Sequence, residues 1–193
     1  MIESLTKKEE IFFREYGLVI LKPDSIELYL ENLFIRDFEY LGLQTEYRRL
    51  LKLTKPDIKF IYPEWATNKS KFRAIAENMT AGQSMLLLLR STGIEVEDLH
   101  SYIKNIKGHA DQPGLRRKYI HIFEEELQSL YPDRKQFLRE LNKNRIHSPE
   151  NACEALHTLI YLWPRLNING ISSTLPRLCD IMSSRLALST YVP

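Results

Sequence analysis

The chain of 193 residues is long enough for one ordinary domain, or for one domain with an added segment. Hydrophobic residues make up 44% of it and charged residues 27%, a balance that supplies both a packed core and a hydrated surface. The 27 lysines and arginines nearly match the 25 aspartates and glutamates. This balance argues against a surface dedicated to nucleic acid or to membranes, because either would need a clear basic excess.

The cysteine content and the first residues favour a cytoplasmic location. The two cysteines, Cys153 and Cys179, are too few for a disulfide framework or a zinc site. The opening residues, MIESLTKKEE, are charged and lack the apolar core of a secretion signal. The longest apolar runs, such as 85–89, are far too short to cross a bilayer. We therefore expect a soluble, cytoplasmic protein with no membrane partner and no nucleic-acid partner.

The first part of the chain alternates between helical and strand-like segments. Residues 4–14 predict a short lead-in helix. The segment YGLVILK, residues 16–22, is apolar on both faces and predicts a buried central strand. Apolar residues then recur at helical spacing over 26–42. Residues 43–53 alternate well enough for a strand, although a helix also fits them.

The alternation continues in the rest of the chain. The predicted elements begin with a short helix from Thr54 that ends at Pro63, a helix at 68–82, a second buried strand at 84–91 and a helix at 94–106. An irregular loop at 107–119, one or two helices broken at Pro132 within 122–144, a short strand at 145–148 and a helix at 149–163 follow. Residues 164–193 show little clear period, so no regular element is predicted there. This order fits an α+β sandwich with helices over one antiparallel sheet.

His147 stands out because of its neighbours. Asn144 lies three residues before it, and a Ser-Pro-Glu helix start follows it at 148–150. This setting suits either an ordinary loop residue or a nucleophile held at the mouth of a cleft.

Four motifs occur in an order that resembles the nucleoside diphosphate kinase family. In chain order they are YGLVILKPDSI, IYPEW followed by KFRAIAENMTAGQSMLLLL, ADQPGLRR and NRIHSPENA. They are similar to the family's opening strand with Lys-Pro-Asp, its Tyr-helix-Met-x-x-Gly-strand segment, its Pro-Gly-x-x-Arg loop end, and its Asn-x-x-His strand with the following helix. The resemblance covers residues 15–163, with one interruption.

The resemblance implies a fold, an activity and a division of the chain. The fold is α+β, a ferredoxin-like antiparallel sheet covered by helices, at 16–163, with a lead-in helix at 1–15 and a tail at 164–193. The activity is transfer of the γ-phosphoryl of ATP to an acceptor nucleotide through a phosphohistidine, with Mg²⁺ bound together with ATP. The implied partners are nucleoside di- and triphosphates, and the implied assembly is a homo-oligomer.

The resemblance also assigns the site residues and no protein ligand for a metal. They are the phospho-accepting His147, Asn144 near the sugar and phosphate, Lys22 of the opening strand, the active-site Tyr62, Phe72 at or beside the aromatic that stacks on the base, and Arg117 of the phosphate-holding loop. The chemistry agrees, because a neutral imidazole is a good nucleophile and cationic side chains position phosphate. Aromatic stacking tolerates every base.

The sequence departs from the family's pattern close to His147. The family's small residue and Ser-Asp-Ser are missing before the helix, and the helix glutamate that orients the histidine corresponds to Ala155 or Thr158, with Glu150 or Glu154 as candidate substitutes. Three further positions differ: His100 stands for a second arginine, Ile106 or Lys107 for a loop threonine, and Ser25 for a glycine. Two alternatives therefore stay open. One is a specialised kinase with a non-standard acceptor, and the other is an inactive nucleotide-binding or scaffolding domain.

The segment between Arg117 and Asn144 is longer than in the family. We expect this insertion, about 119–143, to be helical and to close over the nucleotide side or contact another subunit. The reason is an apolar stripe formed by Leu127, Leu130, Phe137, Leu138 and Leu141. We also expect His147 on or just after an inner strand, close enough to Lys22 for both to reach one triphosphate.

Overall fold

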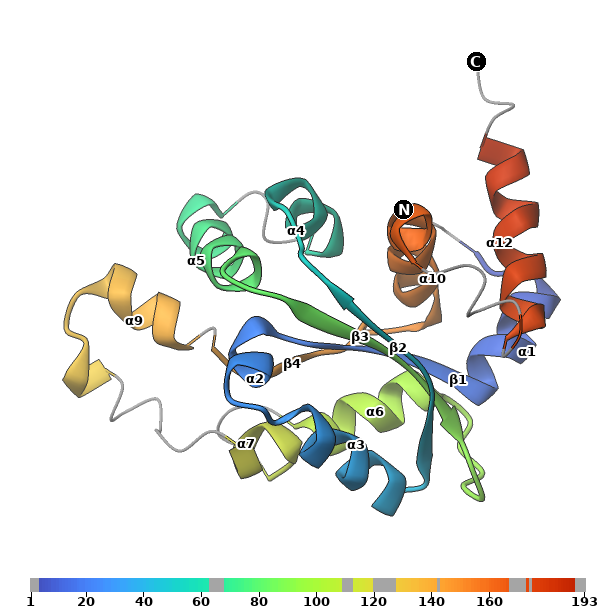
Figure 1. Cartoon of the computed structure of the whole chain (residues 1–193), viewed down its shortest axis with the longest axis horizontal. Helices are drawn as coiled ribbons and strands as arrows, with labels where there is room; N and C mark the ends of the chain where they lie inside the picture. The colour runs from blue at the N-terminus through green and yellow to red at the C-terminus, as the bar shows by residue number, and fades with distance from the viewer. Residues whose placement is uncertain are drawn as a thin grey trace.

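A single antiparallel sheet forms the centre of the protein (Figure 1). The computed structural model of the chain describes residues 4–62, 68–108, 113–119, 128–141, 143–166, 173 and 175–189. Within these residues the strands are β1 (Tyr16–Leu21), β2 (Leu43–Leu51), β3 (Ser84–Ser91) and β4 (Ile146–His147), in the order β2-β3-β1-β4. All neighbouring pairs are antiparallel, which confirms the predicted ferredoxin-like α+β fold.

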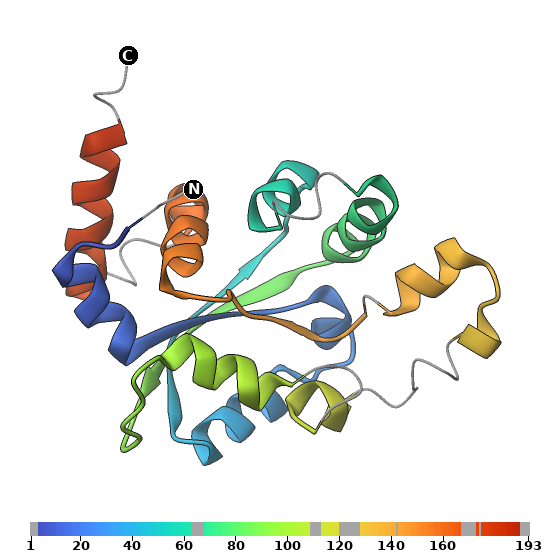
Figure 2. The same cartoon turned by 180° about the vertical axis from the view of Figure 1, so that it is seen from behind.

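Helices cover both faces of this sheet. They are α1 (Lys7–Glu15), α2 (Pro23–Glu27), α3 (Glu31–Tyr40), α4 (Lys55–Ile61), α5 (Lys69–Thr80), α6 (Leu99–Lys107), α7 (Leu115–Tyr119), α9 (Arg134–Leu141), α10 (Ala152–Leu162), a 3-10 turn (Trp163–Arg165) and α12 (Pro176–Ser189). Figures 1 and 2 show α4, α5 and α10 on one face and α3, α6 and α7 on the other. The sheet therefore lies between two apolar cores.

The two cores explain why the central strands are apolar on both faces. Along β1, Leu18 and Ile20 enter one core, whereas Val19 enters the other. The facing strand β3 alternates in the same way, and Val19 lies opposite Leu87. Because successive side chains of a strand point to opposite faces, a strand covered on both sides reads as a continuous apolar run. The prediction of two buried central strands is confirmed.

Some predicted element boundaries are wrong. The single helix predicted over 26–42 is two helices, α2 and α3, separated at Tyr29, whose φ of 55° is left-handed and cannot continue a helix. The helix predicted over 94–106 begins only at Leu99, where Asp98 caps it by accepting a hydrogen bond from the backbone N–H of His100. Part of the loop predicted over 107–119 is the short helix α7.

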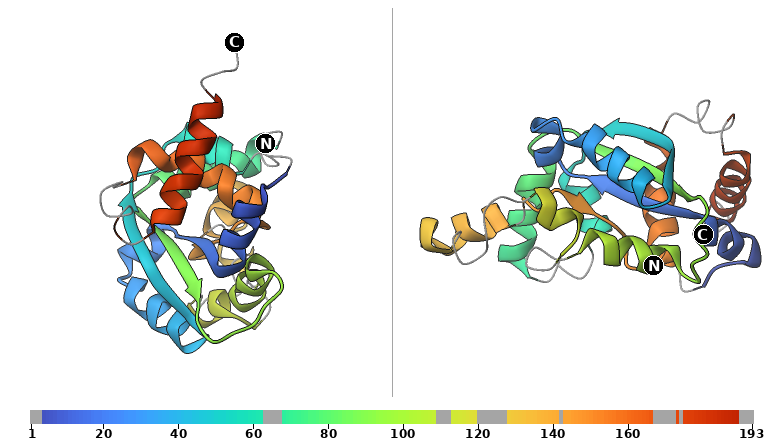
Figure 3. Two further views of the ribbon diagram at one scale, coloured as in Figure 1. Left: turned by 90° about the vertical axis from the view of Figure 1, so that its right-hand side faces the viewer. Right: turned by 90° about the horizontal axis from the view of Figure 1, so that it is seen from below.

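The C-terminal segment contains a helix that the sequence reading did not predict. Helix α12 lies beside α1 at one end of the sheet (Figures 1 and 3), and its Leu178 and Met182 are fully buried. On the outer side, Arg185 donates two hydrogen bonds of 2.6 Å to the carboxylate of Glu9. The signal was the spacing of Leu178, Ile181 and Met182, which places them on one helical face.

The location of His147 differs from the expectation of an inner strand. Strand β4 is two residues long and lies at the edge of the sheet, where it pairs only with β1. His147 lies opposite Ile20, so β4 runs beside the last residues of β1. The edge position brings His147 next to the chain that leaves β1, which is where Lys22 follows. No helix in the described ranges is long and apolar enough to cross a membrane.

Buried His100 should make the fold sensitive to acid. His100 is 1% exposed, and within the described residues neither ring nitrogen has a hydrogen-bond partner. Burial lowers its pKa from 6.5 to about 4. As the pH falls, the unfolded chain therefore takes up a proton on this histidine before the folded chain does. The contribution of neutral His100 to the free energy of unfolding is complete above pH 6.5 and is lost as the pH falls toward 4.

We expect the unfolding free energy of His100→Leu to fall less than that of the wild type between pH 6.5 and 4, by on the order of 2–3 kcal/mol. Urea denaturation at several pH values measures this difference. His157 is only partly buried, and His157→Leu is the matched control that should keep most of the wild-type loss. Equal losses in the wild type and His100→Leu would show that another group causes the acid sensitivity.

Candidate active site

The end of β1 and the start of β4 are joined by backbone and side-chain hydrogen bonds. The N–H of Lys22 donates to the carbonyl oxygen of Arg145 at 2.8 Å, and the hydroxyl of Ser25 donates to the same oxygen at 2.6 Å. Arg145 lies directly between Asn144 and β4. The Lys-Pro-Asp turn thus holds the segment that carries Asn144 and His147.

Arg145 is itself held in an unusual conformation. Its φ is 66°, in the left-handed region that a side chain with a Cβ rarely adopts. Asp24 compensates for this by accepting hydrogen bonds from the backbone N–H of Arg145 at 3.1 Å and from its Nη1 at 3.0 Å. The guanidinium also donates from Nε to the carbonyl oxygen of Tyr119 at 3.2 Å. Arg145 therefore ties the turn after β1 and the end of α7 to β4.

Replacing Arg145 with alanine should destabilise the protein by about 3 kcal/mol, because it leaves the carboxylate of Asp24 without its charged partner in a mostly buried position. The side chains of this pair are only 15% and 11% exposed. The matched control is Arg73→Ala, which breaks the exposed Arg73–Glu77 pair on α5 and should cost less than about 0.5 kcal/mol. Urea unfolding measures both. Equal costs would mean that the Asp24–Arg145 pair does not hold the segment.

Lys22 and Asn144 meet in this arrangement. The ammonium of Lys22 donates to Oδ1 of Asn144 at 2.6 Å, and Lys22 is 4% exposed. Burial lowers the pKa of Lys22 to about 7, with repulsion from Arg116 and Lys107 in the same direction and attraction to Asp24 opposing it. Near neutral pH, Lys22 is therefore only partly protonated, and a bound anion would raise its pKa and complete its positive charge.

His147 lies in the same cluster and is neutral. Its residue is 7% exposed, and burial together with the positive charges of Lys107, Lys22 and Arg116 holds its pKa well below 6.5. A neutral imidazole carries the lone pair that a nucleophile needs. Within the described residues, the buried Nε2 has no hydrogen-bond partner.

The remaining predicted residues lie at different distances from the imidazole. The ring of Tyr62, at the end of α4, lies 4.5 Å from the ring of His147, centre to centre, at 54°. Phe72 is half-buried on α5 and packs against the same core cluster as Tyr62. Arg117 is half-buried on α7. Contacts in the structure join Lys22 to Asn144 and Tyr62 to His147.

A comparison with known families assigns the chain. The family model described as "Nucleoside diphosphate kinase" matches residues 15–168. The chain belongs to the nucleoside diphosphate kinase family. It is therefore a nucleoside diphosphate kinase-like enzyme, a transferase that binds nucleotides. Members of this family act on nucleotides, generally need a divalent metal and generally form oligomers.

Individual relatives agree with this assignment. A nucleoside diphosphate kinase of Anaeromyxobacter sp. (strain K) is 26% identical over 158 residues, which cover 81% of this chain and 93% of the relative. A nucleoside diphosphate kinase of Anaeromyxobacter dehalogenans (strain 2CP-C) has the same identity and coverage. The fold matches the solved NDP kinase of Pyrobaculum aerophilum, with a TM-score of 0.56 and 18% identity over 75% of this chain and 93% of that one. The Aquifex aeolicus enzyme has a TM-score of 0.54 and 21% identity, with 77% and 94% covered.

The position of the family's orienting glutamate is apolar or neutral here. Ala155 and Thr158, on α10, are 0% and 1% exposed. Among the described residues neither candidate substitute bonds Nε2 of His147, which has no partner there. Instead, Glu150 forms an ion pair with Lys104, and a carboxylate oxygen of Glu154 accepts a hydrogen bond from the N–H of Glu150.

The structure brings in three residues that the motifs did not assign to the site. They are Lys107, Arg116 and Ser148. Arg116 donates from Nη2 to the carbonyl oxygen of Ile146 at 2.9 Å, and its charge acts on both His147 and Lys22. The Pro-Gly-x-x-Arg pattern pointed to Arg117 instead. Because α7 is helical, Arg116 and Arg117 face different directions, and the sequence pattern does not say which of them faces His147.

Residues 128–130 and 134–141 of the insertion are helical, and α9 packs against α5. Residues 120–127 and 142, with Leu127 among them, lie outside the described residues, as do the side chains of Leu138 and Leu141.

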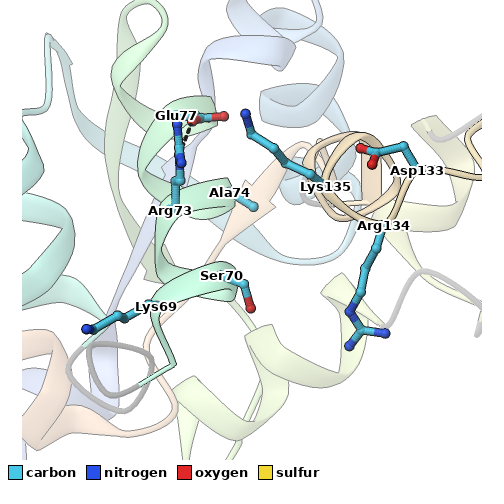
Figure 4. Close-up of a pocket in the computed structure, with 8 residues that line it drawn as sticks. All are labelled: Lys69, Ser70, Arg73, Ala74, Glu77, Asp133, Arg134 and Lys135. Atoms are coloured by element: carbon cyan, nitrogen blue, oxygen red, sulfur yellow. Dashed lines mark hydrogen bonds and ion pairs between the residues drawn. The ribbon is translucent and has the colours of Figure 1, made fainter.

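A hollow of about 450 Å³ lies between α5 and α9 (Figure 4), lined by Lys69, Ser70, Arg73, Ala74, Glu77, Asp133, Arg134 and Lys135. Its charged groups do not converge on one point (Figure 4), and none of them belongs to the cluster around His147. This hollow is therefore not at the chemistry, and the contact with α5 brings the insertion to the helix that carries Phe72.

Proposed function

We propose that the protein moves the γ-phosphoryl of ATP to an acceptor nucleotide through a phosphohistidine at His147. The observation that carries this proposal is a buried, neutral imidazole surrounded by the cations Lys22, Lys107 and Arg116. Positive charge at this density suits the terminal phosphates of a nucleotide, and a neutral imidazole suits attack on phosphorus.

The transfer takes place in two displacements. In the first, the Nδ1 lone pair of His147 attacks the γ-phosphorus, the bond to the bridging oxygen breaks, and its electron pair leaves with ADP. In the second, a terminal phosphate oxygen of the acceptor attacks the phosphorus, and the imidazole recovers its lone pair. Lys22 and Arg117 bind phosphate oxygens, Asn144 positions the nucleotide, and Phe72 stacks on the base. Tyr62 fixes the plane of the imidazole through its ring contact.

The proposed Mg²⁺ enters with the nucleotide. The charged side chains that act on His147 are ammonium and guanidinium groups, which cannot ligate a metal. Within the described ranges, no three His, Cys, Asp or Glu side chains come together as a metal site. The described residues therefore do not fit a protein-held ion, and phosphate oxygens of ATP are its ligands in this proposal. We assign no step to the metal.

The experiment is incubation with γ-labelled ATP, followed by a test for label that is stable in alkali and labile in acid, and by peptide mapping to His147. A chase with a panel of nucleoside diphosphates then identifies the acceptor. Label that appears but is not removed by any nucleoside diphosphate supports the specialised kinase. Tight ATP binding without label supports the nucleotide-binding domain, which the unpartnered Nε2 of His147 also favours.

We also propose that the protein works as a homo-oligomer on nucleoside di- and triphosphates in the cytoplasm, with residues 16–163 as the catalytic unit. Strand β2 supports the oligomer, because it lies at the edge of the sheet and exposes Leu50, which is 42% accessible. Sedimentation equilibrium measures the assembly. A monomer at enzyme concentrations that support turnover would contradict it.

A further inference from the structure

Lys107 is the last residue of α6, and its ammonium lies inside the candidate site. The residue is 6% exposed, and its Nζ donates to the hydroxyl of Ser148 at 2.8 Å. Ser148 directly follows His147. The helix ends there because Gly108 has a φ of 67°, a left-handed conformation suited to glycine. Helix α6 thus delivers a charged group to the residue that directly follows β4.

The charge of Lys107 has no anion bonded to it in the described part of the chain. Its hydrogen-bond partner is the neutral hydroxyl of Ser148. The nearby carboxylate of Glu150 forms its ion pair with Lys104, one turn earlier on the same helix. A buried ammonium without a counter-ion costs free energy, so a site that retains one is suited to receive an anion.

The two neighbouring cations also donate to neutral oxygen atoms. Lys22 donates to the amide oxygen of Asn144, and Arg116 donates to the carbonyl oxygen of Ile146. Among the charged side chains that act on His147, Lys107 has the largest effect, ahead of Lys22 and Arg116. The residue whose charge acts most strongly on His147 is therefore one that the sequence motifs did not assign to the site.

We propose that Lys107 is a catalytic residue whose ammonium binds the phosphoryl group while it moves between the nucleotide and His147. This inference rests on the proposed function and adds a residue to it. An ammonium has three donors, so with one directed to Ser148, two remain for phosphoryl oxygens. As the bond from phosphorus to the bridging oxygen breaks and the bond to Nδ1 of His147 forms, these donors stabilise the charge on the transferred oxygens. Lys107 keeps its protons throughout.

The protonation of Lys107 is compatible with this role. Burial, reinforced by the charge of Arg116, lowers its pKa to about 8, so the group remains mostly charged near neutral pH. A bound phosphate would raise that pKa and complete the charge. A hydroxyl, which the family's pattern places at this position or the one before it, could donate only one bond and no charge.

The test compares Lys107→Met with Lys104→Met. Methionine keeps the length and the apolar stem of lysine but removes its charge, and Lys104 is a matched control because it lies on the same helix with a side chain 42% exposed. Single-turnover labelling of His147 by γ-labelled ATP measures transfer, and calorimetry measures ATP affinity. We expect Lys107→Met to label about 10²–10³-fold more slowly, as for the loss of one preorganised donor. We expect its ATP affinity to fall much less, and Lys104→Met to behave as the wild type.

A second variant separates chemistry from folding. Lys107→Ala leaves space where the ammonium was, and added methylammonium should restore part of its labelling rate if the missing charge is the cause. Labelling of Lys107→Met at the wild-type rate would overturn the role of Lys107 and leave the proposed function intact. Failure of methylammonium to restore any rate would also count against the catalytic role. Absence of label on the wild-type protein would instead overturn the proposed function, and the catalytic role with it.

Discussion

His147→Ala should abolish phosphoryl labelling while leaving ATP binding nearly intact. The imidazole is the only group of the proposed site that forms a bond to phosphorus, and the two residues proposed to bind the phosphates, Lys22 and Arg117, remain in place. Loss of a nucleophile lowers the rate by roughly 10⁵–10⁶-fold where it has been measured. Rapid-quench labelling and calorimetry with ATP test the two halves of this expectation.

Two further variants make the result specific. His147→Gln changes the volume less and should be equally inactive, which excludes a cavity as the cause. His157→Ala, on α10, removes a histidine that stacks on Phe60 rather than on the site, and should label normally. Label that persists in His147→Ala would place the acceptor nitrogen elsewhere, and ping-pong kinetics through His147 would then be wrong.

The absence of an orienting carboxylate predicts slow chemistry. An acid–base partner in position contributes about 10²–10⁴-fold to a proton-coupled step. Within the part of the chain that the structure describes, Nε2 of His147 is buried without a partner, and the ring contacts Tyr62. A turnover rate below that of relatives with the glutamate would therefore be compatible with the proposed mechanism.

The sequence predicts the sheet better than the helices, for a physical reason. A strand covered on both faces, such as β1, is apolar throughout, and a run of only strand length that ends at a proline favours a strand over a buried helix. The break between α2 and α3 depends on a single left-handed residue, Tyr29, whose identity gives no warning of it. Helix α12 combines a short apolar stripe with serines and arginine, so its pattern becomes clear only when its partner α1 is known.

The site was predictable where motifs describe backbone connections. The Lys-Pro-Asp turn and the Asn-x-x-His segment meet because β1 pairs with β4, so Lys22 and Asn144 come together. Motifs do not describe the phase of a short helix, which decides between Arg116 and Arg117. They also do not describe the point at which α6 ends, which brings Lys107 to Ser148. Both unpredicted cations come from helix ends whose positions depend on tertiary packing.

The buried cations connect stability with activity. Each of Lys22 and Lys107 loses hydration when the chain folds, and burial is the main cause of the lowered pKa of each. A carboxylate near His147 would relieve this cost, but it would also compete with the phosphates for the same donors. The free protein therefore carries buried positive charge that a nucleotide would bind, and ATP should raise its melting temperature.

Lys22→Met should remove most of the activity and at the same time stabilise the free protein. Lys22 is 4% exposed, and its positive charge is repelled by those of Arg116 and Lys107. A methionine of similar length avoids both this repulsion and the cost of removing the ammonium from water. Transfer should fall by about 10²–10³-fold, because the variant lacks a donor to the phosphoryl oxygens. ATP affinity should fall too, since Lys22 faces phosphate in the ground state. Thermal unfolding, calorimetry and single-turnover labelling measure the three effects.

The pH dependence distinguishes Lys22 from a merely structural residue. The pKa of Lys22 is about 7, so in the free enzyme its charge is lost as the pH rises through 7, and kcat/KM should decline there. Lys22→Met cannot show this decline and should retain only the later one, near pH 8, which belongs to Lys107. The terminal phosphate of ATP also titrates in this range, but it affects both proteins equally. Identical profiles for the wild type and Lys22→Met would show that the charge of Lys22 does not act on the phosphoryl group.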